Sequence, residues 1–187
     1  MVTWRRLRAT CLPSSAAQAH AGAGYGPASD GDGGRGQRRI MRIKNVTVRD
    51  AHDKQADGYT YVDVRSVPEF EMGHPAGAVN VPLLHHDPRT GMVMPNRDFL
   101  RVMQANFTPD AKLLLGCQVG ARSAQAAQML SMSGYSDVSN VIGGFGGGRD
   151  PMTGAFVEGW AQAALPIDTG SEGSYEQLRS KVSGGDR

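Results

Sequence analysis

Short β-rich segments and helical patterns alternate along the sequence from Met41 onward, and this alternation limits the possible folds more than any other feature. We expect strands at residues 46–48, 59–64, 78–81, 112–115 and 138–142. Helical patterns lie between them, over residues 49–56, 68–71, 98–106 and 123–133. The alternation predicts an α/β fold with a parallel sheet and helices on both faces.

Both ends of the chain depart from this pattern. Residues 1–40 are rich in Gly, Ala, Ser and Arg and have no periodic apolar pattern, so we expect a disordered N-terminal extension. Its acid-poor start suits a transit peptide; alternatively, Met41 is the true start and the gene model extends too far. Residues 169–187 are polar, and we expect a tail with one short helix near 175–182. The folded domain is then predicted to span residues 41–168.

Composition and charge exclude several classes of protein. The chain has 187 residues, 40% of them hydrophobic, and a formal net charge of +2, and much of its basic excess lies in the N-terminal extension. We therefore expect no nucleic-acid partner. No apolar run approaches the roughly 20 residues of a membrane-spanning helix, so we expect no membrane partner either.

The two cysteines, Cys11 and Cys117, lie far apart in the sequence and form no Cys-x-x-Cys pair. This spacing excludes a disulfide framework and a cysteine-rich metal site, and it favours a reducing compartment. We expect a cytoplasmic protein, or an imported one if the N-terminal extension belongs to it. We predict no metal site and no cofactor.

Cys117 stands where the apolar run 113–115 ends and the next helical pattern begins. Backbone N–H groups of residues 118–123 can surround its sulfur, and both the positive end of the helix and Arg122 favour the thiolate. A structural cysteine would have more apolar neighbours in the sequence. The position therefore predicts a nucleophile.

Charged and hydroxyl side chains near this cysteine have structural as well as functional interpretations. Arg122 is a cation at a helix start, where it opposes the helix dipole, and this suggests an anionic partner. Ser123 is more simply a helix cap. Asp63 and Arg65 lie at the carboxyl end of the strand at 59–64, where ligands bind in such sheets, and they form either a structural ion pair or part of the substrate site.

Other conspicuous residues have simpler explanations. We expect His85 and His86 to be solvated loop residues rather than metal ligands, and His74 to hold a loop in place. Trp160 is expected to begin a helix that packs on the sheet. The glycines of residues 143–148 lack the order of a phosphate-binding loop and predict flexible backbone near the site.

Three stretches of the sequence resemble the single-domain rhodaneses, a family of sulfurtransferases. They are residues 62–82, which read VDVRSVPEF and then GHPAGAVNVP; residues 117–123, which read CQVGARS; and residues 134–145 together with Trp160, Leu165 and Pro166. The resemblance extends over residues 43 to 168. It implies a three-layer rhodanese-like α/β domain.

The resemblance also implies a reaction. Cys117 would take a sulfane sulfur from thiosulfate or a related small donor, carry it as a persulfide, and pass it to a thiophilic acceptor, namely cyanide in vitro or a thiol. Arg122 would neutralise the anionic donor, and Asp63 and Arg65 would lie beside the site. The amides that would hold the outer sulfur belong to Gln118, Val119, Gly120, Ala121, Arg122 and Ser123.

This sequence departs from the family pattern in two places. Gly116 precedes the cysteine where an aromatic or aliphatic residue is common, and about ten extra residues at 146–157 separate the double glycine from Trp160. Both departures bear on which sulfur acceptor the site would select.

Two other functions use the same kind of thiol. A cysteine-dependent phosphatase, or an arsenate reductase-like enzyme, is the main alternative, but cysteine phosphatases place the arginine six positions after the cysteine so that the loop encloses a phosphate. Arg122 follows Cys117 by five positions, and this shorter loop favours a single sulfur atom. A non-enzymatic redox-sensing or binding module is the third possibility.

Overall fold

The computed structural model describes residues 43–87, 89–150 and 153–183. The chain divides into two units, residues 1–38 and 39–187, and all described residues belong to the second unit. The expected disordered extension of residues 1–40, with Cys11, lies outside the described residues.

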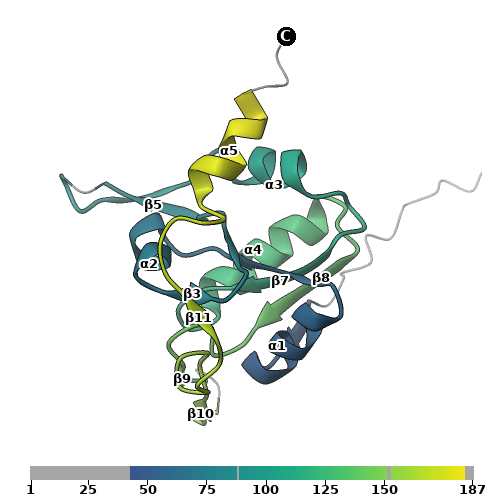
Figure 1. The fold of residues 1–187 in the computed structure, drawn as a ribbon, viewed down its shortest axis with the longest axis vertical. Coiled ribbons are helices and arrows are strands. Elements are labelled where there is room, and N and C mark those ends of the chain that lie inside the picture. Colours follow the sequence, from purple (N-terminus) through teal and green to yellow (C-terminus); the bar gives the residue numbers. More distant parts are fainter. Residues whose placement is uncertain (1–42, 88, 151–152, 184–187) are drawn as a thin grey trace, which may run out of the picture. The chain divides into compact units, whose positions relative to one another are not determined.

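A five-stranded sheet forms the centre of this unit, and all of its neighbouring strands are parallel, as the sequence predicts (Figure 1). In sheet order its strands are β1 (Lys44–Val46), β8 (Asp137–Val141), β7 (Lys112–Gly116), β2 (Thr60–Asp63) and β4 (Val79–Asn80). Alternate side chains of the buried strand β7 point to opposite faces of the sheet. Leu113 and Leu115 pack into one core cluster and Leu114 into the other.

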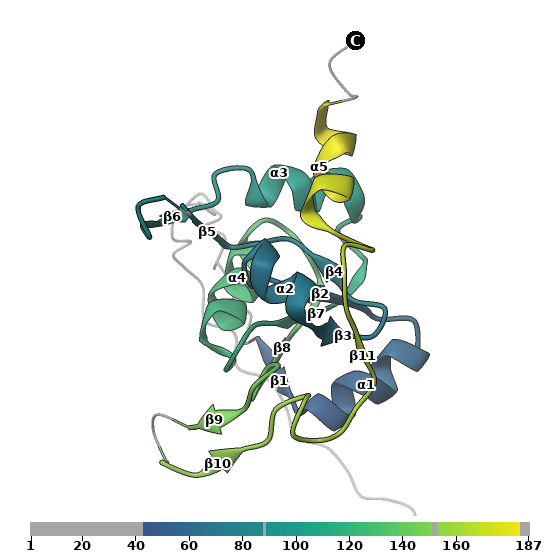
Figure 2. The same cartoon turned by 60° about the vertical axis from the view of Figure 1, so that its left-hand side comes forward.

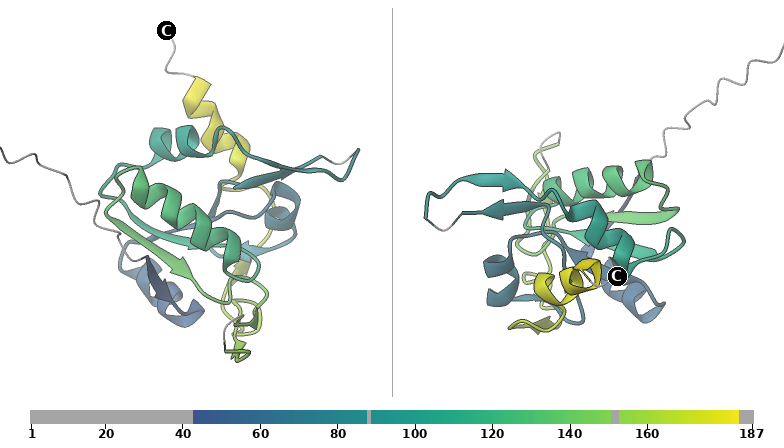
Figure 3. Two further views of the ribbon diagram at one scale, coloured as in Figure 1. Left: turned by 180° about the vertical axis from the view of Figure 1, so that it is seen from behind. Right: turned by 90° about the horizontal axis from the view of Figure 1, so that it is seen from above.

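Helices cover both faces of the sheet (Figure 3). The cluster around Leu114 includes side chains of α1 (Val48–Ala56) and α2 (Val67–Met72). The cluster around Leu113 includes side chains of α3 (Phe99–Asn106), α4 (Ala121–Met132) and α5 (Tyr175–Ser183). No helix within the described ranges is long and apolar enough to cross a membrane.

Within the described residues, three small antiparallel pairs lie outside the central sheet (Figure 2). They are β3 (His74–Pro75) with β11 (Ile167–Asp168), β5 (Leu84–His86) with β6 (Val93–Pro95), and β9 (Gly148–Arg149) with β10 (Phe156–Val157). The extra residues expected at 146–157 include the β9–β10 hairpin. The β5–β6 hairpin contains His85 and His86, so these residues are not in a loop as expected; His85 is half-buried, with its ring centroid 5.4 Å from that of Tyr175.

The first strand ends earlier than expected. Instead of continuing to Val48, it stops at Val46, because Thr47 caps helix α1. The Thr47 side chain accepts a hydrogen bond from the backbone N–H of Asp50 at 3.2 Å, and Val48 is buried as the first residue of the helix.

The helix expected at Trp160 is a turn over residues 160–164. Ala164 has a positive φ of 53° and Pro166 follows shortly after, so the turn does not continue as a helix. The expected packing is nevertheless correct, because Trp160 is fully buried and its indole N–H donates to the Pro166 carbonyl at 2.8 Å. Its ring meets that of Tyr61 edge-on at 5.4 Å.

The segment after residue 168 is more than the expected polar tail. Its short helix, α5, packs against α3 and adds Tyr175 and Leu178 to the core (Figure 3). The Tyr175 hydroxyl donates to the side-chain oxygen of Asn96 at 3.2 Å, which joins this helix to the start of α3.

Candidate active site

Cys117 lies directly after strand β7 and shortly before helix α4, at the carboxyl edge of the sheet. Its sulfur accepts a hydrogen bond from the backbone N–H of Gly120 at 3.1 Å. Gly120 has a φ of 105°, a conformation that favours glycine, and this turn directs its N–H toward the sulfur. The side chain of Cys117 is almost completely buried, so the sulfur lies at the bottom of the loop.

Ser123 does not cap the helix as expected. It is the third residue of α4, it is fully buried, and its hydroxyl lies 3.4 Å from the Cys117 sulfur and 3.1 Å from the Gly120 carbonyl oxygen. A single hydroxyl hydrogen can serve one of these acceptors at a time. Ser123 therefore supplies the sulfur with an adjustable donor.

The anionic partner suggested for Arg122 is Glu69, which sequence reasoning missed. The guanidinium donates to both carboxylate oxygens of Glu69, at 2.9 and 3.1 Å. One of these oxygens also accepts hydrogen bonds from the Ser66 hydroxyl at 2.6 Å and the Ser66 backbone N–H at 3.0 Å. Burial would raise the pKa of Glu69, but the hydrogen bonds from Arg122 and Ser66 outweigh it and lower the pKa to about 2. The pair is therefore charged at neutral pH.

Asp63 and Arg65 form a buried ion pair, as one of the two interpretations from the sequence expects, and their role in substrate binding stays a prediction. The Asp63 carboxylate accepts from the Arg65 Nε at 2.9 Å and from Nη2 at 2.6 Å, and both side chains are at most 3% exposed. Arg65 also donates to the Gly73 carbonyl at 2.7 Å and lies 4.3 Å from the centroid of the Phe145 ring. The pair touches the cysteine loop through Gln118, whose side-chain oxygen lies 3.4 Å from Arg65 Nη1.

The remaining loop residues lie nearer the surface. Val119 and Ala121 are exposed, and Val119 stands beside the β9–β10 hairpin, near Gly148. The backbone N–H of Gly120 is the amide of the loop that donates to the sulfur. A wider set of amides around an outer sulfur stays a prediction.

The glycine-rich stretch after β8 is closely packed rather than flexible, which corrects the expectation for residues 143–148. The backbone N–H groups of Phe145 and Gly146 donate to the carbonyls of Cys117 and Gln118, at 2.8 and 2.9 Å. A Cβ on Gly144 would overlap the Cys117 carbonyl. Glycine is required here because two backbones meet, and this contact holds the loop from behind.

His74 has the structural position that the sequence predicts. It is buried, its Nδ1 lies 2.8 Å from the Phe70 carbonyl oxygen, and its ring stacks on that of Phe70 at 3.6 Å. It holds the segment that follows α2.

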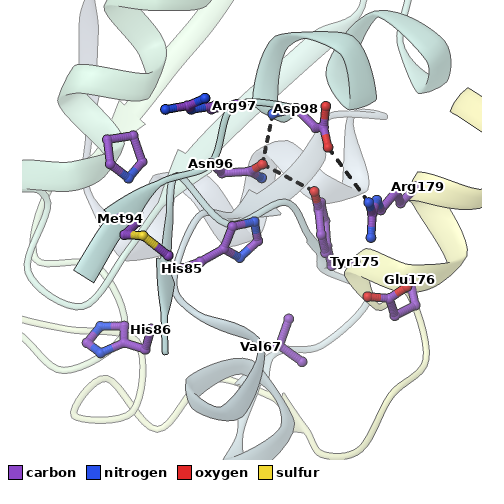
Figure 4. A pocket seen from close by; sticks show the side chains of 11 residues that line it. Val67, His85, His86, Met94, Asn96, Arg97, Asp98, Tyr175, Glu176 and Arg179 are labelled. Carbon is purple, nitrogen blue, oxygen red and sulfur yellow. Dashed lines mark hydrogen bonds and ion pairs between the residues drawn. The ribbon is translucent and has the colours of Figure 1, made fainter. Parts of the chain in front are cut away.

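The Arg122–Glu69 pair opens on a cavity of about 720 Å³ between α2 and the β5–β6 hairpin. The rest of its lining is mainly apolar and comprises Ser66, Pro68, Leu84, His86 and Val93. A second cavity, of about 750 Å³, lies between the same hairpin and α5 and shares His86 (Figure 4). In it, the Tyr175 hydroxyl donates to Asn96 at 3.2 Å and Asp98 lies 3.9 Å from Arg179.

The sequence model of the rhodanese-like domain matches residues 47–149, and this chain belongs to that family. It is 34% identical over 130 residues to thiosulfate sulfurtransferase 16, chloroplastic, of Arabidopsis thaliana. The aligned region covers 70% of this chain and 95% of that protein. It is 34% identical over 136 residues to thiosulfate sulfurtransferase 18 of the same plant, covering 72% of this chain and 90% of the relative.

A solved structure agrees with this membership. The crystal structure of Rv0390 from M. tuberculosis superposes with a TM-score of 0.55 at 25% identity and covers 68% of this chain and 98% of that one. The rhodanese-like α/β fold expected from the sequence is confirmed.

Proposed function

We propose that this protein is a sulfurtransferase that carries a sulfane sulfur as a persulfide on Cys117. One observation carries the proposal: the cysteine sulfur lies buried at the end of β7, with the Gly120 N–H at 3.1 Å and the Ser123 hydroxyl at 3.4 Å directed toward it. These donors, at the start of α4, suit a sulfur anion. The relatives named thiosulfate sulfurtransferases support the same assignment.

The reaction is a double displacement. The Cys117 thiolate attacks the outer sulfur of thiosulfate, the S–S bond of the donor breaks, and sulfite leaves with the bonding electron pair. The new bond joins Cys117 Sγ to the transferred sulfur. In the second step, cyanide or a thiolate attacks that outer sulfur, and Cys117 leaves as the thiolate with which the cycle began.

The chain's own groups assist both steps. The Gly120 N–H and the Ser123 hydroxyl donate to Cys117 Sγ, the atom that attacks in the first step and leaves in the second, and Arg122 faces the incoming anionic donor. Arg65 and Asp63 keep their structural pairing and fix Gln118 in the loop. The steps require no metal or cofactor.

A thiosulfate:cyanide assay on three proteins tests the proposal. The activity of the unaltered protein should be abolished in Cys117→Ser and retained in Cys11→Ser, which is the matched control because it removes the other cysteine of the chain. Activity that survives Cys117→Ser at the level of the control would overturn the proposal. Hydrolysis of an aryl phosphate in place of sulfur transfer would support a phosphatase instead.

The N-terminal extension bears on where the protein is located in the cell. We propose a cytoplasmic location, or import into an organelle if residues 1–40 act as a transit peptide; thiosulfate sulfurtransferase 16 of Arabidopsis thaliana is named as chloroplastic. Imaging fluorescent fusions of the full chain and of a chain starting at Met41 tests this. Organelle signal that depends on residues 1–40 would support import, and diffuse signal from both would support the cytoplasm.

A further inference from the structure

The cation beside the candidate active site is already neutralised within the chain. Arg122 gives two hydrogen bonds to Glu69, at 2.9 and 3.1 Å, in the two-point geometry that makes arginine–carboxylate pairs strong. Their side chains are 24% and 27% exposed, and both line the cavity of about 720 Å³. A sulfur donor that enters this cavity therefore meets a carboxylate together with the guanidinium.

Glu69 cannot easily turn away from the site. Its carboxylate is fastened by the hydroxyl and the backbone N–H of Ser66, in the arrangement by which a residue in the first turn of a helix reaches back to the residue before it. Its pKa of about 2 keeps it charged at neutral pH; although burial opposes the charge, the hydrogen bonds from Arg122 and Ser66 outweigh it. A fixed negative charge thus belongs to the wall of the cavity.

We propose that Glu69 determines which sulfur donors the site accepts, by favouring donors with a single negative charge and an apolar body over doubly charged thiosulfate. This inference rests on the proposed sulfurtransferase function. The apolar wall formed by Pro68, Leu84 and Val93 suits the organic part of such a donor, for example an alkyl thiosulfonate. With that donor, the Cys117 thiolate takes the outer sulfur and a sulfinate leaves with the electron pair.

The charge of the donor provides a quantitative test. The interaction between Glu69 and a donor is proportional to the donor's charge, so its free energy is twice as large for thiosulfate as for methanethiosulfonate. We therefore expect Glu69→Gln to lower the KM for thiosulfate about tenfold and that for methanethiosulfonate about threefold, the square root of the first factor. The value of kcat should change little, because the substituted group does not touch the sulfur.

Glutamine is a suitable replacement because it can keep the backward hydrogen bond to Ser66 and still accept from Arg122. Glu71→Gln is the matched control: it removes the same charge from the same helix, at an exposed position. Its KM values for both donors should match those of the unaltered protein. A fall that is equal for the two donors, or equal in both variants, would overturn the proposal. A rise in both KM values would show that Glu69 only positions Arg122 and does not select among donors.

Binding without transfer separates this inference from the proposed function. In Cys117→Ser no sulfur can be transferred, so NMR titration measures only the binding of each donor. The Kd values are compared between Cys117→Ser and the double variant that also carries Glu69→Gln. The same factors, about tenfold and threefold, are expected there. If they appear while the unaltered protein transfers no sulfur, the selectivity stands and the proposed function fails. If transfer occurs but the Kd ratio does not change, the selectivity fails alone.

Discussion

The phenol ring of Tyr61 lies so close to Gly116 that a Cβ on the glycine would overlap the ring and its oxygen. Tyr61 is buried on β2 and meets Trp160 edge-on, so the ring has no free space into which it could move. Burial raises the pKa of Tyr61 well above its usual value, so it remains a neutral phenol. Gly116 therefore accommodates the Tyr61–Trp160 aromatic pair beneath the residue before Cys117.

Gly116→Ala should lower the free energy of unfolding by about 1 to 3 kcal/mol, because the added methyl group overpacks a closed site. In a Tyr61→Leu background the same substitution should cost less, since the atoms that the methyl group meets are gone. Urea denaturation of the four proteins measures both costs. An equal cost in the two backgrounds would show that Tyr61 is not the reason for the glycine.

Asp63→Asn should lower the free energy of unfolding by about 3 to 5 kcal/mol, because it leaves the buried Arg65 guanidinium without its counter-charge. Glu158→Gln is the control, since Glu158 pairs with Arg49 at 3.0 Å but on the surface. An exposed pair contributes about 1 kcal/mol or less. Urea denaturation compares the two variants, and similar costs would contradict a structural role for the buried pair.

The ion pair of Glu69 should stabilise the protein in a defined pH range. Folding lowers the pKa of this carboxyl from its usual 4.5 to about 2, so its contribution is fully present above pH 4.5 and is lost as the pH falls toward 2. The difference in Tm between the unaltered protein and Glu69→Gln should therefore shrink over this interval. Glu71→Gln, which removes an exposed carboxyl group from the same helix, is the control. A constant difference for Glu69→Gln would contradict the assigned pKa.

Arg122→Ala should raise the KM for thiosulfate about tenfold or more, because charge-assisted hydrogen bonds are each worth about 1.5 to 3 kcal/mol. The fold should persist, since the side chain is partly exposed and lines a cavity. Steady-state kinetics give the KM, and circular dichroism checks the fold. An unchanged KM would remove Arg122 from the donor site.

The sequence was sufficient for the central sheet and for the position of Cys117. The apolar run 113–115 is buried on both faces, and such strands stand out in a sequence because few polar residues interrupt them. The loop that follows can be located from the sequence, because the end of a strand and the start of a helix mark its two ends. The same local logic predicts an anionic partner for Arg122, and in the structure its guanidinium pairs with Glu69.

The identity of that anion could not be read from the sequence. Glu69 precedes Arg122 by 53 positions, and its spacing from Ser66 indicates only a local role at the start of a helix. The packing of Tyr175 on the core was missed for a similar reason. Such features depend on tertiary contacts that override local propensity.

Mass spectrometry after incubation with thiosulfate tests the central claim most directly. The intact protein should gain one sulfur atom, peptide mapping should place it on Cys117 and not on Cys11, and cyanide should remove it. Cys117→Ser should gain none. A protein that gains no sulfur on Cys117, but hydrolyses an aryl phosphate, would contradict sulfur transfer and favour a cysteine-dependent phosphatase.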